Sequence, residues 1–250
     1  MLSLPAQEAH FWSCRPDLLP TSKLDYLTRI GAVLDASEQQ RRDRFKFERH
    51  ALMFSVSHAL VRYVLSQYAD LEPAQWCFEK NQHGKPYVVN SGFEHLQFSL
   101  SHTDGYAAMA ICSDSEIGCD VEKRRDNIRA ADIADRFFSK REVAALLSND
   151  EVLQHFRFFD YWSLKESYIK AKGKGLAIPL GDFSFELGTR PITFTAVSAL
   201  EEDTSLWYFE LLDVGVDHAA AIAAPQELLK VKRFTAVPLE SFEEIPPAFR

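Results

Sequence analysis

Two carboxylates in the middle of the chain have the spacing of a cation site. Asp120 and Glu122 are two residues apart in the short run Gly-Cys-Asp-Val-Glu, which is typical of a strand. Side chains alternate along a strand, so both carboxylates project to one face while Val121 points into the core. Two like charges on one face repel unless a cation lies between them, and Mg²⁺ is a natural choice. Taken alone, the motif is better explained by a solvated strand edge.

A second set of candidate residues falls on a segment that the sequence predicts to be helical. Trp162, Glu166 and Lys170 follow one another at intervals of four, so they form one stripe along a helix. A glutamate followed four residues later by a lysine is usually a surface ion pair. Here the helix leads into Lys-Gly-Lys-Gly at 172–175, which concentrates positive charge beside the carboxylate. A surface ion pair is therefore a less complete explanation.

Two predicted turns add residues that suit phosphates. Ser101 and His102 lie where a strand meets a turn, and Lys85 and Pro86 follow Gly84 in another turn. A Ser-His pair is compatible with a hydrolase, but neighbours on a strand face opposite ways and no G-x-S-x-G elbow is present. Neither glycine-lysine turn of the chain matches a P-loop. A lone histidine in a turn is more often structural than catalytic.

The segments that would position these residues alternate between helices and short strands. Apolar residues recur every three to four positions at 37–68, and Ser37 with Gln40 gives a capping-box signal at the start. Further helices are predicted at about 128–147 and 152–171, the second ended by glycines. Apolar runs between turn residues predict strands at 9–14, 76–79, 87–89, 96–100, 106–111, 117–122, 182–186, 192–198, 206–212 and 218–223.

Helix followed by strands occurs twice, which predicts two α+β halves. The runs at 106–111 and 218–223 are faintly alike, although apolar strands often look alike. We expect an N-terminal α+β half at 1–115 and a C-terminal α+β half at 116–250 that carries the carboxylates and the WSLKES helix. A cleft between two such halves is a common place for a ligand.

Composition restricts the class of protein. The chain has 250 residues, of which 46% are hydrophobic and 26% charged, so it can bury a sizeable core. Its 28 Lys and Arg against 36 Asp and Glu give a net charge of −8, which argues against a general nucleic-acid binder. The four scattered cysteines suggest neither a disulfide framework nor a thiolate zinc site. With no signal-peptide pattern or membrane-length apolar run, we expect a cytoplasmic protein.

The order of the motifs is more specific than any one of them. It runs through a basic segment at 41–49, Gly84-Lys85-Pro86, Ser-Leu-Ser-His at 99–102, Ile-Gly-Cys-Asp-Val-Glu at 117–122, Arg-Phe-Phe-Ser at 136–139 and WSLKESYIK at 162–170. Over about 37–180 this order resembles the 4′-phosphopantetheinyl transferases of the longer, Sfp-type group. The resemblance implies two pseudo-symmetric α+β halves, the 4′-phosphopantetheinyl transferase-like fold, with the active-site cleft between them and a monomer as sufficient unit.

The resemblance also implies a reaction with its partners. The 4′-phosphopantetheine arm of coenzyme A would pass to a serine of an apo acyl or peptidyl carrier protein, releasing adenosine 3′,5′-bisphosphate. Carriers of fatty-acid, polyketide and nonribosomal peptide synthesis all fit this reaction. Neither a nucleic acid nor a membrane is expected as a partner.

The family's motifs imply roles for individual residues. Asp120, Glu122 and Glu166 would coordinate Mg²⁺ or Mn²⁺, and Glu166, Lys170 and His102 would be catalytic. Glu166, acting through Lys170 or a metal-held water, is the candidate for removing the serine proton. The predicted contacts to coenzyme A are Arg41, Lys85, Pro86, Ser101, His102 and Lys170.

Two surfaces follow less directly from the motifs. Relatives often carry arginines where this chain has the apolar residues 51–53, so Arg41, Arg44 or Arg49 would have to hold the coenzyme A 3′-phosphate instead. An apolar, basic surface for an acidic carrier is expected beside the active-site helix. Core packing is the favoured interpretation for Phe137, whereas core and interface have equal weight for Phe138. The other candidates for this surface are Lys140, Arg141 and 172–179.

Two other functions are compatible with part of the pattern. A Mg²⁺-dependent nucleotide hydrolase would use the same carboxylates and lysines, but it has no need of the 162–170 helix linked to the turn at 84–86. A non-catalytic module that binds coenzyme A or a carrier protein would be favoured if a metal carboxylate were missing. Asp120, Glu122 and Glu166 are all present.

Overall fold

The computed structural model describes residues 1–20, 24–226 and 230–246, so the expected C-terminal half is described except at 227–229 and 247–250. Its helices are α1 (Leu24–Ala32), α2 (Ala36–Arg42), α3 (Glu48–Leu65), α4 (Ala130–Phe137), α5 (Lys140–Leu147) and α6 (Glu151–Lys172). Its strands are β1 (Glu8–Cys14), β2 (Phe78–Lys80), β3 (Pro86–Val88), β4 (Leu96–Thr103), β5 (Tyr106–Ser113), β6 (Gly118–Lys123), β7 (Phe183–Glu186), β8 (Thr193–Ala196), β9 (Trp207–Leu212), β10 (His218–Pro225), β11 (Lys230–Val237) and β12 (Ser241–Ile245).

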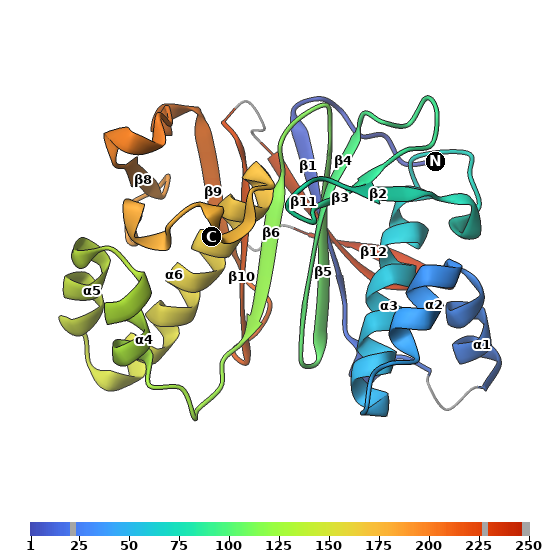
Figure 1. Ribbon diagram of the computed structural model, residues 1–250, viewed down its shortest axis with the longest axis horizontal. Helices are drawn as coiled ribbons and strands as arrows, with labels where there is room; N and C mark the ends of the chain where they lie inside the picture. The colour runs from blue at the N-terminus through green and yellow to red at the C-terminus, as the bar shows by residue number, and fades with distance from the viewer. Residues whose placement is uncertain (21–23, 227–229, 247–250) are drawn as a thin grey trace.

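The same arrangement of strands and helices occurs twice. In the first half the strand order β1-β5-β4 is joined by α3 and the small β2-β3 sheet, and in the second β6-β10-β9 is joined by α6 and the small β7-β8 sheet. All pairings within these two sets of three strands are antiparallel. Figure 1 shows the two halves side by side, with β5 and β6 at the centre. The predicted α+β fold with two pseudo-symmetric halves is therefore confirmed.

The similar apolar runs at 106–111 and 218–223 form the equivalent central strands β5 and β10. Their side chains alternate between two environments, as strand geometry requires. Met109 and Ile111 pack in the core under α3, whereas Ala108 and Ala110 pack against the other half with Val121. Small alanine side chains at this second position let the two sheets approach closely.

The last described segment returns to the first half. β11 pairs in parallel with β1, and β12 extends the sheet beyond it. The expectation that all of 116–250 belongs to the C-terminal half is therefore wrong for Lys230–Ile245. No periodicity in this segment indicates its partner, because pairing with β1 depends on a strand more than 200 residues away.

Two predicted helices are each divided in two. The predicted helix at 37–68 breaks between α2 and α3, and its capping box is formed by Asp35 and Glu38 rather than Ser37 and Gln40. The Ser37 hydroxyl instead donates to the Asp35 carboxylate. The predicted helix at 128–147 breaks into α4 and α5, because a second capping box starts α5. Only the second break is set by a capping residue, Ser139, since α3 begins after Phe47 without a side-chain cap.

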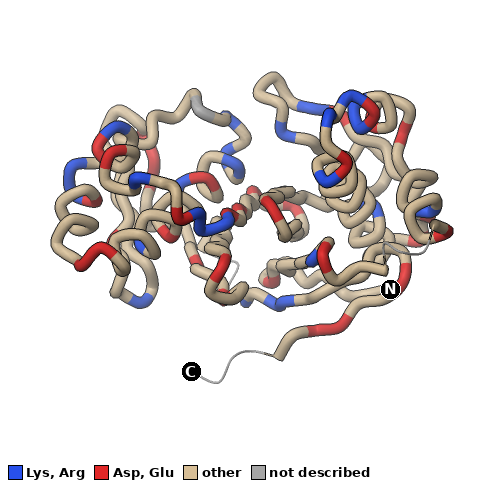
Figure 2. Tube along the Cα trace, turned by 90° about the horizontal axis from the view of Figure 1, so that it is seen from below, with Lys and Arg blue, Asp and Glu red and all other residues tan. Residues whose placement is uncertain are grey.

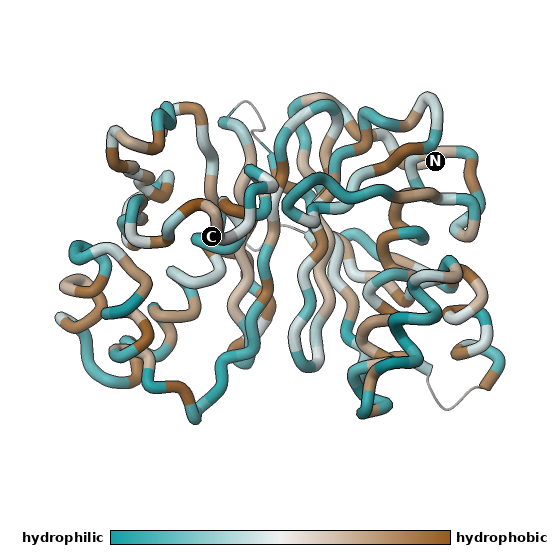
Figure 3. Tube along the Cα trace, viewed as in Figure 1, coloured by the Kyte–Doolittle hydropathy of each residue, from teal (hydrophilic) through white to brown (hydrophobic). Residues whose placement is uncertain are grey.

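The outer helices bury one side and expose the other. Figure 3 shows hydrophobic and hydrophilic residues alternating along them, which is the pattern of an amphipathic helix. None of the helices in the described part of the chain is long and apolar enough to cross a membrane.

Candidate active site

The two strand carboxylates lie as the sequence predicts. Both are on β6, where Asp120 is 2% exposed, Glu122 is half-buried and Val121 packs between the halves. The Asp120 Oδ1 atom accepts hydrogen bonds from the Lys170 ammonium at 2.7 Å and from the Ser101 hydroxyl at 2.9 Å. The Asp120 Oδ2 atom is buried and has no hydrogen-bond partner among the described residues. Only one of the two Asp120 carboxylate oxygens therefore has hydrogen-bond donors among the described residues.

The helix α6 brings the third carboxylate and the lysine to β6. Trp162, Glu166 and Lys170 all lie on a half-buried face of this helix, as their spacing predicts. The close packing depends on Gly118 at the start of β6. A Cβ atom there would lie 1.9 Å from the Ser167 carbonyl oxygen and 2.5 Å from the Ala171 nitrogen.

We expect Gly118→Ala to separate α6 from β6. The obstructing atoms are helix backbone, which cannot rotate away as a side chain could, so the substitution should cost about 1–3 kcal/mol of unfolding free energy. It should also lower transfer activity, because Glu166 and Lys170 move away from Asp120. Urea unfolding and a kinetic assay check both effects. Gly181→Ala is the control, because its backbone is not left-handed and the added atom would meet only ordinary contacts at 3.9 Å. Equal behaviour of the two variants would contradict the expectation.

Burial and repulsion between the carboxylates raise the pKa values of two of them. Burial and the negative charge of Asp120 raise the pKa of Glu122 to about 7. Burial and the same charge raise the pKa of Glu166. Burial lowers the pKa of Lys170, but the contact with Asp120 outweighs it and raises the pKa, so this side chain stays an ammonium. The site has an excess of negative charge that one ammonium only partly balances.

The C-terminal end of α6 is held by the N-terminal half. Asn81 Nδ2 donates to the Gly173 carbonyl at 2.8 Å. The Lys85 ammonium donates to the carbonyls of Ala171 at 2.9 Å and Ile117 at 3.1 Å. A cation on the last carbonyls of a helix satisfies orphan acceptors and suits the helix dipole. Lys85 thus bridges the halves in this structure, so the predicted phosphate contact requires its ammonium to be shared or released.

Basic residues of the N-terminal half lie near His102, which in turn lies near Lys170 of α6. The pKa of His102 is lowered to about 4 because protein atoms crowd its ring and because His58, Lys170 and Arg41 add positive charge nearby. The His102 side chain nevertheless stays exposed, as does that of Arg41. In Figure 2, Lys and Arg positions occur along the backbone of both halves, on the sides where the two halves face each other. Arg41, His58 and Lys170 thus lie close enough to His102 to influence its protonation.

Cavities connect these groups. One of about 300 Å³ lies between the halves, with Lys85 and Pro86 on one side and Glu166 and Lys170 on the other. Pro86 also lines a neighbouring cavity of about 120 Å³ that contains Arg41, Phe54 and His58. Another, of about 500 Å³, contains the cationic or ionisable side chains of Arg49, His50, His102 and Arg125. A phosphate-rich ligand lying along this cleft would meet positive charge from both halves.

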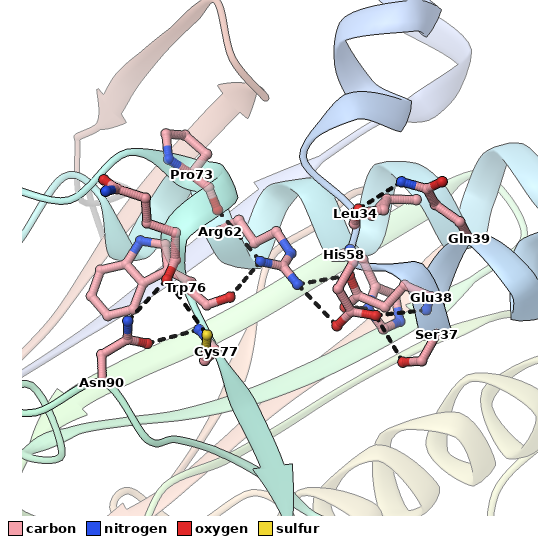
Figure 4. A network of polar contacts seen from close by, with 12 residues as sticks. Leu34, Ser37, Glu38, Gln39, His58, Arg62, Pro73, Trp76, Cys77 and Asn90 are labelled. Carbon is pink, nitrogen blue, oxygen red and sulfur yellow. Dashed lines mark hydrogen bonds and ion pairs between the residues drawn. The ribbon is translucent and has the colours of Figure 1, made fainter.

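The sequence gives no signal for His58, because its position near His102 depends on a network of polar contacts around the buried Arg62 (Figure 4). Arg62 is 1% exposed and donates to the Glu38 carboxylate at 2.8 Å and to the Trp76 carbonyl at 2.6 Å. Glu38 Oε1 in turn lies 2.6 Å from His58 Nδ1. Burial raises the pKa of Glu38, but the hydrogen bonds from His58 and Asp35 and the charge of Arg62 lower it to about 2. The network fixes α2, which carries Arg41, against α3.

The middle of the Trp162–Lys170 motif has a structural purpose. Lys165 is fully buried, and its ammonium lies 2.8 Å from the Glu142 carboxylate. It also donates to the carbonyls of Leu180 and Phe183, both at 2.7 Å. Lys165 therefore joins α5 and the segment after α6 to the helix that carries Glu166 and Lys170.

Of the two phenylalanines at 137 and 138, the expected core packing is wrong for Phe137, and Phe138, for which core and interface had equal weight, lies in the core. Phe138 is 6% exposed and packs in the core of the C-terminal half, stacked on Phe158. Phe137 is 39% exposed and contacts Trp162 edge-on. α4 ends at Phe137 and its C-cap Phe138 has an extended backbone, so the two side chains do not continue the helical period that the sequence suggests.

Comparisons with known proteins agree with this architecture. The model of the 4′-phosphopantetheinyl transferase superfamily matches residues 116–223, and that of the 4′-phosphopantetheinyl transferase N-terminal region matches 20–114. The 4′-phosphopantetheinyl transferase HetI of Nostoc sp. is 35% identical over 70% of this chain and 73% of its own length. Sfp of Bacillus subtilis is 34% identical over 64% of this chain and 69% of its own length.

A solved structure, the holo-[acyl-carrier-protein] synthase of Thermotoga maritima, is similar over 44% of this chain and 62% of that chain, with a TM-score of 0.36 and 18% identity. The family models and the sequence relatives cover both halves of the fold and include the carboxylates on β6 and α6. The chain is an enzyme of the 4′-phosphopantetheinyl transferase family, in its Sfp-type group.

Proposed function

We propose that this enzyme transfers the 4′-phosphopantetheine arm from coenzyme A to a serine of an apo acyl or peptidyl carrier protein. The observation that supports the proposal best is the cleft between the halves, which is lined by Lys85 and Pro86 from one half and by Glu166 and Lys170 from the other. Lys170 also binds Asp120, and Asp120 and Glu122 are neighbours on one face of β6. Carboxylates suit a metal-bound pyrophosphate, and the cations suit the remaining phosphates of the nucleotide. A single chain forms both sides of this cleft, which supports a monomer, and we propose that it acts in the cytoplasm.

The donor chemistry of the site fits a hard divalent cation, Mg²⁺ or Mn²⁺. The Oδ2 atom of Asp120 has no hydrogen-bond partner among the described residues, and the pKa values of Glu122 and Glu166 are raised by burial and by the charge of Asp120. Three buried oxygen donors that repel one another in this way suit a divalent cation. Within the described residues, no three such side chains are already arranged as a ligand set. Asp120, Glu122 and Glu166 would hold the ion once their side chains are rearranged around it, and a bound ion would neutralise charge on the pyrophosphate.

The residues of the chain would bind and orient the two substrates. In the reaction the serine oxygen forms a bond to the phosphorus that carries pantetheine, the bond from that phosphorus to the bridging oxygen breaks, and adenosine 3′,5′-bisphosphate leaves. Lys170 and Arg41 would hold phosphate oxygens and balance their charge. His102, with its pKa lowered to about 4, is neutral at pH 7 and would donate a hydrogen bond to a phosphate oxygen. Pro86 would lie beside the adenine.

Glu166 is the proposed acceptor of the serine proton. Its carboxylate lines the cavity between the halves, and Lys170, one turn further along α6, also lines it. We expect Glu166→Gln to lower kcat by about 10²-fold, which is the lower end of the contribution of a positioned base. Steady-state kinetics at saturating Mg²⁺ check the expectation. Full turnover of this variant would eliminate Glu166 as the base.

The proposed reaction has a product that no simple binding module would form. The chain, coenzyme A, Mg²⁺ and an apo carrier protein should together give adenosine 3′,5′-bisphosphate, which chromatography resolves from coenzyme A. Omission of the carrier should stop its formation. A nucleotide hydrolase would instead release the bisphosphate or another fragment without any carrier, and that result would overturn the proposal.

A further inference from the structure

The two halves meet along a row of side-chain hydroxyl groups. β4 and β6 belong to different sheets. Ser99, Ser101 and Thr103 are alternate residues of β4, and each is less than 10% exposed. Their hydroxyl oxygens accept hydrogen bonds from successive alternate backbone N–H groups of β6, namely Cys119 at 3.1 Å, Val121 at 3.3 Å and Lys123 at 3.3 Å. We call these three contacts the hydroxyl seam.

The seam does for β6 what a neighbouring strand would otherwise do. An unpaired edge of a sheet leaves backbone N–H groups without acceptors, and buried donors need them. In the N-terminal half the equivalent edge of β1 is covered by the backbone of β11. In the C-terminal half the hydroxyls of β4 take that place. The register of the seam therefore sets the position of β6, and with it of Asp120, relative to the N-terminal half.

Ser101 is the member of the seam that reaches the charged groups. Its hydroxyl donates to Asp120 Oδ1 at 2.9 Å and accepts from the Lys170 ammonium at 2.8 Å and from the Val121 N–H. A serine hydroxyl has one donor hydrogen and two acceptor lone pairs. All three are used within the protein, so this hydroxyl has nothing left with which to bind a substrate.

We propose that Ser101 is a positioning residue, which fixes Asp120 and Lys170 to the hydroxyl seam, rather than a contact to coenzyme A. This inference rests on the proposed transfer reaction and replaces the cofactor-binding role that the family resemblance implies for the Ser101 side chain. The Ser101 hydroxyl oxygen, which contacts both Asp120 and Lys170, is held at a fixed place between the halves by the Val121 N–H. Loss of the hydroxyl would let the carboxylate and the ammonium move together away from the geometry that the reaction needs.

Three variants separate positioning from binding and from simple stability. Ser101→Ala should lower kcat by about tenfold or more while the KM for coenzyme A changes by less than about twofold. Ser99→Ala removes the same kind of seam bond without a contact to Asp120 or Lys170, so it should lower the urea midpoint as much and kcat far less. Ser101→Thr should restore kcat, since Thr103 shows that the seam accepts a threonine.

A second measurement tests the geometry without any turnover. Heteronuclear NMR of the free enzyme should show slow hydrogen exchange for the Lys170 ammonium in the wild type and in Ser99→Ala, and faster exchange in Ser101→Ala. Equal kcat in the two alanine variants, or a rise in KM that matches the fall in kcat, would overturn the positioning role. A wild type that transfers nothing would overturn the proposed function instead, and the exchange rates would still decide the inference.

Discussion

Asp120→Asn is expected to lower the rate of transfer by about 10²–10³-fold, the cost of removing one preorganised charged group from a phosphoryl-transfer site. The amide keeps the shape of the side chain. It has one neutral oxygen in place of two anionic ones, so it loses the ion pair with Lys170 and offers a poor ligand to a divalent cation. Steady-state kinetics with a carrier protein at saturating coenzyme A measure the loss.

The control for this variant is Asp132→Asn. Asp132 pairs with Arg129 on the exposed surface of α4, so its amide variant should be as active as the wild type. Urea unfolding of both variants shows whether the fold is kept. An Asp120→Asn enzyme that is folded and within about threefold of wild-type activity would contradict a role for this carboxylate in the reaction.

Lys165→Met is expected to destabilise the fold by about 3–5 kcal/mol, because it leaves a buried charge without its partner. Glu142 is fully buried, and besides Lys165 it accepts hydrogen bonds from the backbone N–H groups of Ser139 and Phe185 and from the Ser139 hydroxyl. The carbonyls of Leu180 and Phe183 also lose their donor. Equilibrium urea unfolding at constant pH measures the change.

Two further variants identify the cause. A double variant, Glu142→Leu with Lys165→Met, should recover part of the lost stability, since neither charge is then left alone. Arg141→Met breaks the neighbouring exposed ion pair with Glu186 and should change the unfolding free energy by less than about 1 kcal/mol. A Lys165→Met effect as small as that of Arg141→Met would show that the buried pair contributes little.

Local patterns in the sequence were sufficient to predict the carboxylates and the helix. The alternation of Asp120 and Glu122 on a strand, and the four-residue spacing of Glu166 and Lys170, depend only on element geometry, and the structure has both. The two-halved α+β fold followed from the repeated order of helices and strands. The predicted metal ligands and coenzyme A contacts remain proposals.

Features that depend on distant partners could not be predicted in this way. Nothing near Ser101 in the sequence shows that its hydroxyl is saturated by Asp120, Lys170 and the β6 backbone. The same holds for Lys85, whose ammonium donates to the carbonyl of Ile117, just before β6, and to that of Ala171 in α6. It also holds for the pairing of β11 with β1. In each case the partner is far along the chain, and only tertiary packing brings it close.

The most direct test of the account is intact-mass analysis of apo carrier proteins after incubation with the enzyme, coenzyme A and Mg²⁺. We predict that a carrier gains the mass of one phosphopantetheine arm, that its serine-to-alanine variant gains nothing, and that Asp120→Asn enzyme gives almost no product in the same time. A set of acyl and peptidyl carriers should be used, so that the choice of partner does not decide the result. Coenzyme A binding without a mass gain on any carrier would contradict the account and indicate a non-catalytic binding module.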